Sequence, residues 1–235
     1  MTLLVDTGGV KSMLTRTATA RLGLVHKPIT DSLVTLYGGA QINHTVNLPK
    51  TDMTPGEFYV MPDNRLPYAL SGTLAPDILS THDVGFDFVK AEMRFFAPGQ
   101  CTLSHALAIR PDDAHHLIVT VELDGERIPA FLDTGASRSE LSYETARRLF
   151  GSAMRAAEPA HRADSEDGVL TYPFETLRVG NVSVDAPDII LVPDNIARRP
   201  ADAPRLLLGM NILRRMKLFV AYGRNRLMVS PAEDR

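Results

Sequence analysis

The sequence has no tryptophan, a single cysteine and no long apolar run. Because Cys101 has no partner within the chain, an internal disulfide framework is excluded. No apolar segment approaches the roughly 20 residues that a membrane-spanning helix needs. The 7 histidines show no spacing typical of a metal site, and no glycine-rich phosphate-binding loop is found. We therefore expect no metal ion, no cofactor and no membrane segment in this chain.

The charge balance of the chain is close to neutral. Its 235 residues include 25 lysines and arginines against 28 aspartates and glutamates, and the pI is about 6.2. This balance suggests neither nucleic acid nor an anionic membrane as a partner. Residues 1–6 carry no basic region and are too short for a signal peptide, so the chain as written predicts a cytoplasmic protein. A signal peptide removed upstream would instead predict a periplasmic or secreted protein.

An internal repeat is the strongest feature of the sequence. An Asp-Thr-Gly triplet follows an apolar run at residues 6–8 and again at residues 133–135, at an offset of 133 − 6 = 127. Nine residues after each aspartate stands a helix-capping residue, Thr15 or Ser142, followed by a helix-favouring stretch. Each copy therefore predicts an apolar strand, an acidic turn, a short strand and a helix.

The ends of the two copies correspond as well. Residues 72–79 resemble residues 206–213, and each segment precedes two strand patterns. Together with the alternating apolar segments inside each copy, this predicts an all-β protein with short helices, built as two pseudo-symmetric lobes with a cleft between them. We expect an N-terminal lobe over residues 1–97, a connector over 98–114 and a C-terminal lobe over 115–235.

The two copies differ in what precedes the aspartate. A complete hairpin precedes the second, with strands over 117–123 and 127–132 around an Asp124-Gly125 turn. Only five residues precede Asp6, so the strand at residues 3–5 lacks a partner. Either the start of the gene lies further upstream, or the chain has been trimmed, or another segment supplies that strand.

Two aspartates in matching loops suggest one shared acid–base site. A single Asp-Thr-Gly is only a turn signal, but two carboxyl groups a hydrogen bond apart share one proton, as in aspartic proteases. The ionised group takes a proton from water, which attacks the substrate carbonyl, and the protonated group donates to the carbonyl oxygen. We predict Asp6 and Asp133 as the catalytic residues. The predicted supporting residues are Thr7, Gly8, Thr134 and Gly135.

The second copy also resembles a known family. Residues 131–137 (Phe-Leu-Asp-Thr-Gly-Ala-Ser) and 207–213 (Leu-Leu-Gly-Met-Asn-Ile-Leu) are similar to the retropepsin-like aspartic peptidases, in particular the bacterial gag-polyprotein putative aspartyl protease group. The resemblance covers about residues 2–96 and 117–229. It implies a catalytic loop, a flap hairpin and a hydrophobic-hydrophobic-Gly segment that braces the loop. Most members form the site by homodimerising, so two copies in one chain imply a monomer with intramolecular lobe pairing.

The first copy departs from the family pattern in two places. Gly9 and Val10 stand where the second copy has Ala136 and Ser137, and Ala75 and Pro76 stand where it has Gly209 and Met210. Pepsin-like sites usually place a hydroxyl group directly after the triplet, and neither Gly9 nor Ala136 supplies one. We therefore expect activity to peak at mildly acidic pH.

These observations predict an aspartic endopeptidase that cuts extended peptides or proteins with a water molecule activated between Asp6 and Asp133. Tyr37, Gly38 and Gly39 lie in a strand–turn pattern and are candidate flap residues. Because the first copy departs from the pattern, the alternative is a catalytically weak or inactive module that binds peptides or regulates a partner. A third possibility retains catalysis but pairs the C-terminal lobe with that of a second chain.

Overall fold

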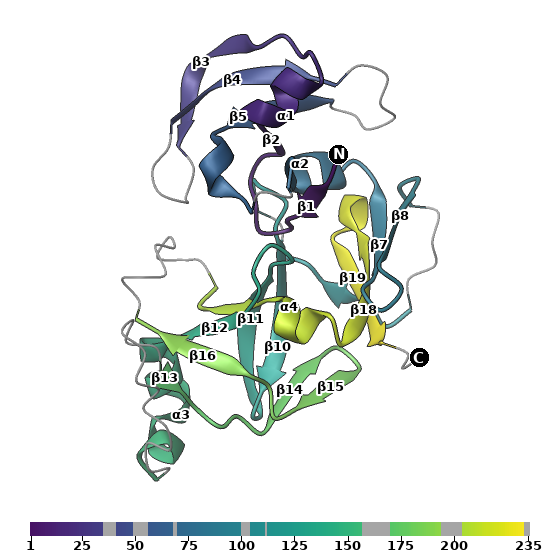
Figure 1. Cartoon of the computed structure of the whole chain (residues 1–235). Coiled ribbons are helices and arrows are strands. Elements are labelled where there is room, and N and C mark those ends of the chain that lie inside the picture. Colours follow the sequence, from purple (N-terminus) through teal and green to yellow (C-terminus); the bar gives the residue numbers. More distant parts are fainter. Residues whose placement is uncertain are drawn as a thin grey trace. The chain divides into compact units, whose positions relative to one another are not determined.

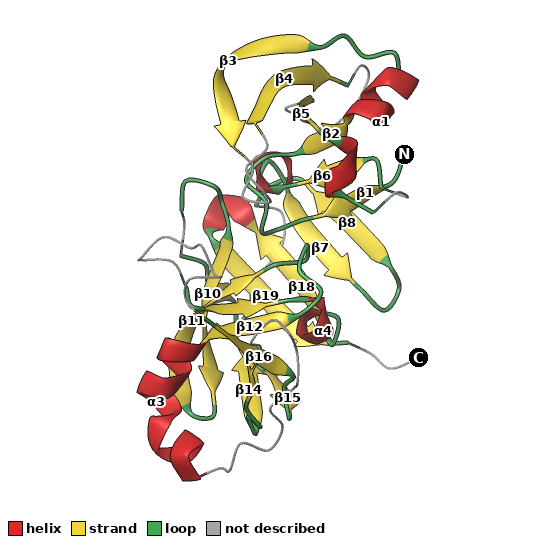
Figure 2. Ribbon diagram, turned by 60° about the vertical axis from the view of Figure 1, so that its left-hand side comes forward, coloured by secondary structure: helices red, strands yellow, loops and turns green. Residues whose placement is uncertain are grey.

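The computed structural model describes residues 1–34, 41–48, 56–67, 70–99, 104–110, 112–156, 170–193 and 204–232. β-strands dominate these residues and the helices are few, which confirms the all-β prediction (Figure 2). The chain divides into two compact units. One comprises Met1–Thr81 with Asp112–His116, and the other comprises His82–Pro111 with Leu117–Arg235. None of the described helices is long and apolar enough to cross a membrane.

The first unit contains a six-stranded sheet in the order β1-β6-β2-β5-β4-β3 (Figure 1). Its strands are β1 (Leu3–Val5), β2 (Met13–Thr15), β3 (Lys27–Val34), β4 (Gln41–Asn47), β5 (Glu57–Met61) and β6 (Gly72–Leu74). Its helical segments are α1 (Arg16–Arg21), η1 (Asp63–Arg65) and α2 (Pro76–Leu79). Leu14, Phe58 and Ile78 are completely buried and form the centre of its core.

The second unit contains an eight-stranded sheet in the order β13-β16-β12-β17-β11-β10-β14-β15. Its strands are β10 (Leu117–Leu123), β11 (Glu126–Leu132), β12 (Ser139–Ser142), β13 (Leu170–Thr171), β14 (Thr176–Val179), β15 (Val182–Asp185), β16 (Ile189–Val192) and β17 (Leu206–Leu208). The helices α3 (Tyr143–Ala156) and α4 (Met210–Leu213) accompany it. Helix α3 buries Ala146 and Phe150, and the Phe150 ring meets that of Phe174 edge-on at 5.4 Å between centroids.

A five-stranded antiparallel sheet completes the second unit, in the order β8-β7-β18-β19-β9. Its elements are β7 (Asp83–Asp87), β8 (Glu92–Phe96), β9 (Leu107–Ala108), β18 (Met216–Ala221), η2 (Tyr222–Arg224) and β19 (Arg226–Pro231). Leu218, Val220 and Leu227 bury their side chains on one face of this sheet. The other face is partly open.

The repeat in the sequence is also a repeat in strand pairing. Strands β1-β6-β2-β5 and β11-β17-β12-β16 have the same order, and in both sets the neighbours run parallel, antiparallel and parallel. The register agrees too. Val5 pairs with Leu74 and Leu132 with Leu208, where 5 + 127 = 132 and 74 + 134 = 208. Each Asp-Thr-Gly loop is therefore supported by the same four-stranded arrangement.

Strands β7 and β18 pair with the symmetry of a two-fold axis. The end segments of the copies are offset by 206 − 72 = 134, so Asp83 corresponds to Lys217 and Asp87 to Ala221. In the sheet, Asp83 pairs with Ala221 and Asp87 pairs with Lys217. Exchanging the copies leaves this register unchanged, which is the property of an isologous interface between identical subunits. Here both strands belong to one chain.

The predicted lobe boundary at residue 97 differs from the division in the structure. The sequence analysis assigns β7 and β8 to the N-terminal lobe, whereas the first unit ends at Thr81. The physical reason is the hydrogen-bonded pairing of β7 with β18, which joins this hairpin to strands of the second copy. The predicted connector over residues 98–114 also contains β9, which pairs with β19 through Leu107 and Ala108.

Local predictions around the two loops are confirmed. Strands β10 and β11 form the predicted hairpin, and both turn residues, Asp124 and Gly125, have positive φ (45° and 83°), as a two-residue hairpin turn requires. Thr15 and Ser142 cap α1 and α3 through their hydroxyl oxygens. Strand β1 pairs with β6, and no described strand takes the place beside β1 that β10 takes beside β11. Tyr37, Gly38 and Gly39 lie outside the described residues, while the strands around them, β3 and β4, pair antiparallel as predicted.

Candidate active site

The second Asp-Thr-Gly loop, residues 133–139, joins β11 to β12. The backbone N–H of Asp133 donates to the carbonyl of Leu208 at 2.9 Å, which fixes the start of the loop against β17. The N–H of Gly135 donates to Oδ1 of Asp133 at 2.7 Å. The Asp133 and Thr134 side chains are almost fully buried. A backbone N–H directed at a buried carboxylate stabilises its ionised form.

The first loop, residues 6–12, repeats these contacts. The N–H of Asp6 donates to the carbonyl of Leu74 at 2.9 Å. The N–H of Gly8 donates to Oδ1 of Asp6 at 3.1 Å. Thr7 is completely buried and Asp6 is half-buried. Each loop thus presents one carboxylate that is oriented by an amide two residues further on.

A serine at the end of the second loop braces it against α4. The hydroxyl of Ser139 donates to Oδ1 of Asn211 at 2.7 Å and accepts the N–H of Gly209 at 3.0 Å. Asn211 in turn donates to the carbonyl of Asp188 at 2.7 Å. This bracing group was not identified from the sequence because its members lie about 70 positions apart.

The first loop has an equivalent brace. The hydroxyl of Ser12 donates to Oδ1 of Asp77 at 2.6 Å and accepts the N–H of Ala75 at 2.9 Å. The N–H of Ser12 also donates to the Asp77 carboxylate at 3.0 Å. The offsets 139 − 12 = 127 and 211 − 77 = 134 relate the two braces. Extending the sequence comparison to these positions would have found them.

Two of the positions at which the first copy departs from the family pattern lie next to each other. In the second copy, a methyl group on Gly209 would meet the carbonyl oxygen of Arg138 and lie 2.7 Å from its carbonyl carbon, so this position must be glycine. The first copy has Ala75 at the equivalent position. A methyl group on Gly9 would lie 3.2 Å from Cβ of Ala75 and 2.9 Å from Oδ2 of Asp6. The first loop keeps its hydrogen bonds with Ala75 at this position.

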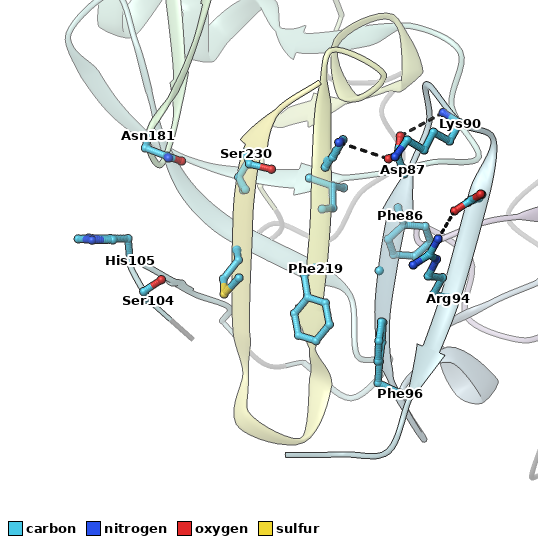
Figure 3. Close-up of a pocket in the computed structure, with 16 residues that line it drawn as sticks. Phe86, Asp87, Lys90, Arg94, Phe96, Ser104, His105, Asn181, Phe219 and Ser230 are labelled. Atoms are coloured by element: carbon cyan, nitrogen blue, oxygen red, sulfur yellow. Dashed lines mark hydrogen bonds and ion pairs between the residues drawn. The ribbon is translucent and has the colours of Figure 1, made fainter. Parts of the chain in front are cut away.

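A pocket of about 430 Å³ lies on the open face of the five-stranded sheet, and none of its lining residues belongs to either Asp-Thr-Gly loop (Figure 3). The Phe96 and Phe219 rings stand in it with centroids 5.5 Å apart. At its other end Asp87 accepts the N–H of Lys90 at 3.1 Å and lies 3.4 Å from Nζ of Lys217. The hydrogen bond from Lys90 and the ion pair with Lys217 hold the pKa of Asp87 below its usual value.

The structure brings the predicted site residues together within each loop. Asp6, Thr7 and Gly8 belong to the first compact unit, and the triplet at residues 133–135 belongs to the second. Among the residues that the structure describes, no three His, Cys, Asp or Glu side chains gather in a way that could hold a metal ion. The chemistry available in each loop is that of one oriented carboxyl group.

One comparison with known proteins matches the second copy to a protein family. Residues 119–215 match the family described as gag-polyprotein putative aspartyl protease. A search of curated proteins finds no match. Among solved structures, the chain is similar to a retropepsin-like aspartic protease from Rickettsia conorii, with 18% sequence identity, 53% of this chain and 87% of that chain covered, and a TM-score of 0.35. The family resemblance predicted from the sequence is confirmed over residues 119–215, and it suggests aspartic protease activity.

Proposed function

We propose that this protein is an aspartic endopeptidase in which Asp6 and Asp133 share one proton and activate a water molecule. The observation that carries the proposal is the equivalence of the two loops. Each orients its carboxylate with an N–H two residues further on, and each is braced by a serine hydroxyl. This shared set of hydrogen bonds orients a carboxylate in both loops, as a site built from both aspartates requires.

The symmetry of the five-stranded sheet supports pairing within one chain. Strands β7 and β18 follow the two copies of the end segment and pair in a register that exchange of the copies leaves unchanged. A homodimer of single-copy subunits would pair in this manner across its interface. The proposed site is therefore one shared site for each chain, with one aspartate from each copy.

In the proposed reaction the two carboxyl groups hold a single proton between them. The ionised carboxylate accepts a proton from water, and the resulting hydroxide forms a bond to the carbonyl carbon of the substrate. The protonated carboxyl group donates its proton to the carbonyl oxygen, which gives a tetrahedral diol. The carboxyl group that accepted the proton from water passes it to the amide nitrogen as the C–N bond breaks, and a hydroxyl group of the diol returns a proton to the other carboxylate, which restores the single shared proton. An extended peptide fits this chemistry because its backbone can hydrogen-bond to neighbouring strands.

The test is an assay on a peptide library with the wild type, Asp6→Asn and Asp133→Asn. Both substitutions remove a group that must transfer a proton, so each should lower kcat by roughly a thousandfold. Asp185→Asn, an exposed position on β15, is the matched control and should retain activity. Circular dichroism of each variant checks that the fold is intact.

Two results would contradict the proposal. Full activity in Asp6→Asn together with a rate that depends on protein concentration would instead indicate a site formed by two copies of the second loop. Failure of the wild type to cleave any library peptide, with measurable peptide binding, would favour the peptide-binding alternative. In the active enzyme, the profile of kcat/KM against pH should peak in mild acid, because neither Gly9 nor Ala136 supplies a hydroxyl group to the carboxylates.

A further inference from the structure

Each Asp-Thr-Gly loop carries one basic side chain, at equivalent positions. The loops read Asp-Thr-Gly-Gly-Val-Lys-Ser at residues 6–12 and Asp-Thr-Gly-Ala-Ser-Arg-Ser at residues 133–139. Lys11 and Arg138 are related by the offset of the repeat, 138 − 11 = 127, and each stands directly before the bracing serine. The catalytic aspartate is the only other charged residue in either loop.

In the first loop, Lys11 follows the Asp-Thr-Gly turn by a few residues. The N–H of Gly9 donates to the carbonyl of Asp6 at 3.2 Å, and a methyl group on Gly9 would lie 2.9 Å from Oδ2 of Asp6. Lys11 follows two residues later, and its Cα lies at most about 7.6 Å from that of Gly9. Ser12 is completely buried, whereas Val10 is exposed and Lys11 is half-buried. Val10 is therefore the exposed residue of this loop, and Lys11 beside it is partly accessible to a bound chain.

The second loop has the same arrangement. The N–H of Ala136 donates to the carbonyl of Asp133 at 3.4 Å. Ser137 and Arg138 are exposed, and Ser139 is completely buried. A peptide lying over the Asp133 carboxylate would therefore meet Ser137 and Arg138 as the outward-facing residues of this loop.

Among the described residues, no carboxylate forms an ion pair with either cation. The Nζ of Lys11 lies 5.7 Å from the centre of the Tyr59 ring, a contact that leaves its charge available. Within the described part of the chain, no ion pair joins Lys11 or Arg138 to an acidic side chain. The chain as a whole carries a net charge of −3, so two uncompensated cations at matching positions in the loops are not a consequence of its composition.

We infer that Lys11 and Arg138 select substrates with acidic side chains on both sides of the scissile bond. This inference rests on the proposed function, because the repeat relates the two cations in the same way as the two aspartates, so each half of the proposed site has one cation. In water, attraction to one such cation about 4 Å away strengthens the binding of a carboxylate by a factor of about five. Each cation should therefore favour Glu over an uncharged Gln by about fivefold at its own side, and disfavour Lys.

The experiment measures kcat/KM for peptides that differ at one residue, Glu, Gln or Lys, placed on either side of the cleaved bond. A pH near 5.5 keeps the substrate Glu ionised. The enzymes are the wild type, Lys11→Glu, Arg138→Glu and the charge-preserving Lys11→Arg and Arg138→Lys. Arg147→Glu, an exposed position on α3, applies the same charge change away from the loops and should leave every preference unaltered.

We expect each substitution to change the charge preference on only one side of the cleaved bond. Lys11→Glu reverses the preference on one side of the bond and Arg138→Glu reverses it on the other, while Lys11→Arg and Arg138→Lys retain it. The wild-type preference should also shrink as salt is raised from 0.05 M to 0.5 M. The inference is overturned, while the proposed function stands, if the wild type cleaves the Glu, Gln and Lys peptides with equal kcat/KM. The same holds if one substitution reverses the preference on both sides of the bond. A wild type that cleaves no peptide overturns the proposed function, and this inference with it.

Discussion

At the scale of single residues, the first copy is a rearranged version of the second. Gly209 is required in the second copy because a methyl group there would meet backbone atoms of Arg138 and Ala136, whereas the first copy has Ala75 at the equivalent position. The sequence alone suggests that Gly9 and Ala75 weaken the first copy. The first loop nevertheless keeps the hydrogen bonds of the second, from Gly8 to Asp6 and from Ala75 to Ser12.

The substitution Gly209→Ala tests this steric argument. Its methyl group would lie 2.7 Å from the carbonyl carbon of Arg138 and 2.9 Å from the carbonyl oxygen of Ala136, both of them backbone atoms. Because backbone can relax little, we expect the free energy of unfolding to fall by about 1–3 kcal/mol. Urea denaturation measures this value. Gly223→Ala is the control, since a methyl group there meets nothing within 4 Å, and equal stability of the two variants would contradict the argument.

At the scale of elements, the loops are held by bonds to distant segments. The short helices α2 and α4 each follow a strand that pairs beside the aspartate, and the residue before each helix, Ala75 or Gly209, donates its backbone N–H to a loop serine. The sequence shows that residues 72–79 and 206–213 correspond. It does not predict that Ser12 and Ser139 reach them, because hydrogen bonds across about 65 residues leave no periodic pattern in the chain.

The substitution Ser139→Ala removes the brace of the second loop. It leaves the N–H of Gly209 buried without its acceptor, which costs about 1–3 kcal/mol. We expect a lower melting temperature and, because the loop carries Asp133, a lower kcat with a smaller change in KM. Ser137→Ala is the control at an exposed position of the same loop. A variant as stable and active as this control would show that the brace is dispensable.

At the scale of the whole molecule, the pairing of β7 with β18 joins strands that follow the two copies. Strand β18 has β7 on one side and β19 on the other, so both of its edges are occupied. A second chain could pair with β18 only by displacing one of them. This arrangement favours one site for each chain over a site shared between two chains.

We therefore predict a monomer with a mass of 25.8 kDa and a specific activity that does not depend on protein concentration. Light scattering coupled to size-exclusion chromatography measures the mass, and a dilution series of the peptide assay measures the specific activity. A rise in specific activity with concentration, accompanied by a dimer in light scattering, would contradict this prediction.

The sequence by itself determined the repeat, the two Asp-Thr-Gly triplets, the caps Thr15 and Ser142, and the hairpin before Asp133. These features depend on residues close together in the chain, on local backbone preferences and on alternating apolar positions. Tertiary structure alone decided that β7 and β8 join the second unit, that Ser12 and Ser139 brace the loops, and that Gly9 lies against Ala75. Each of these depends on atoms that approach only after distant strands have paired, and strand pairing over such separations is set by the packing of the whole chain.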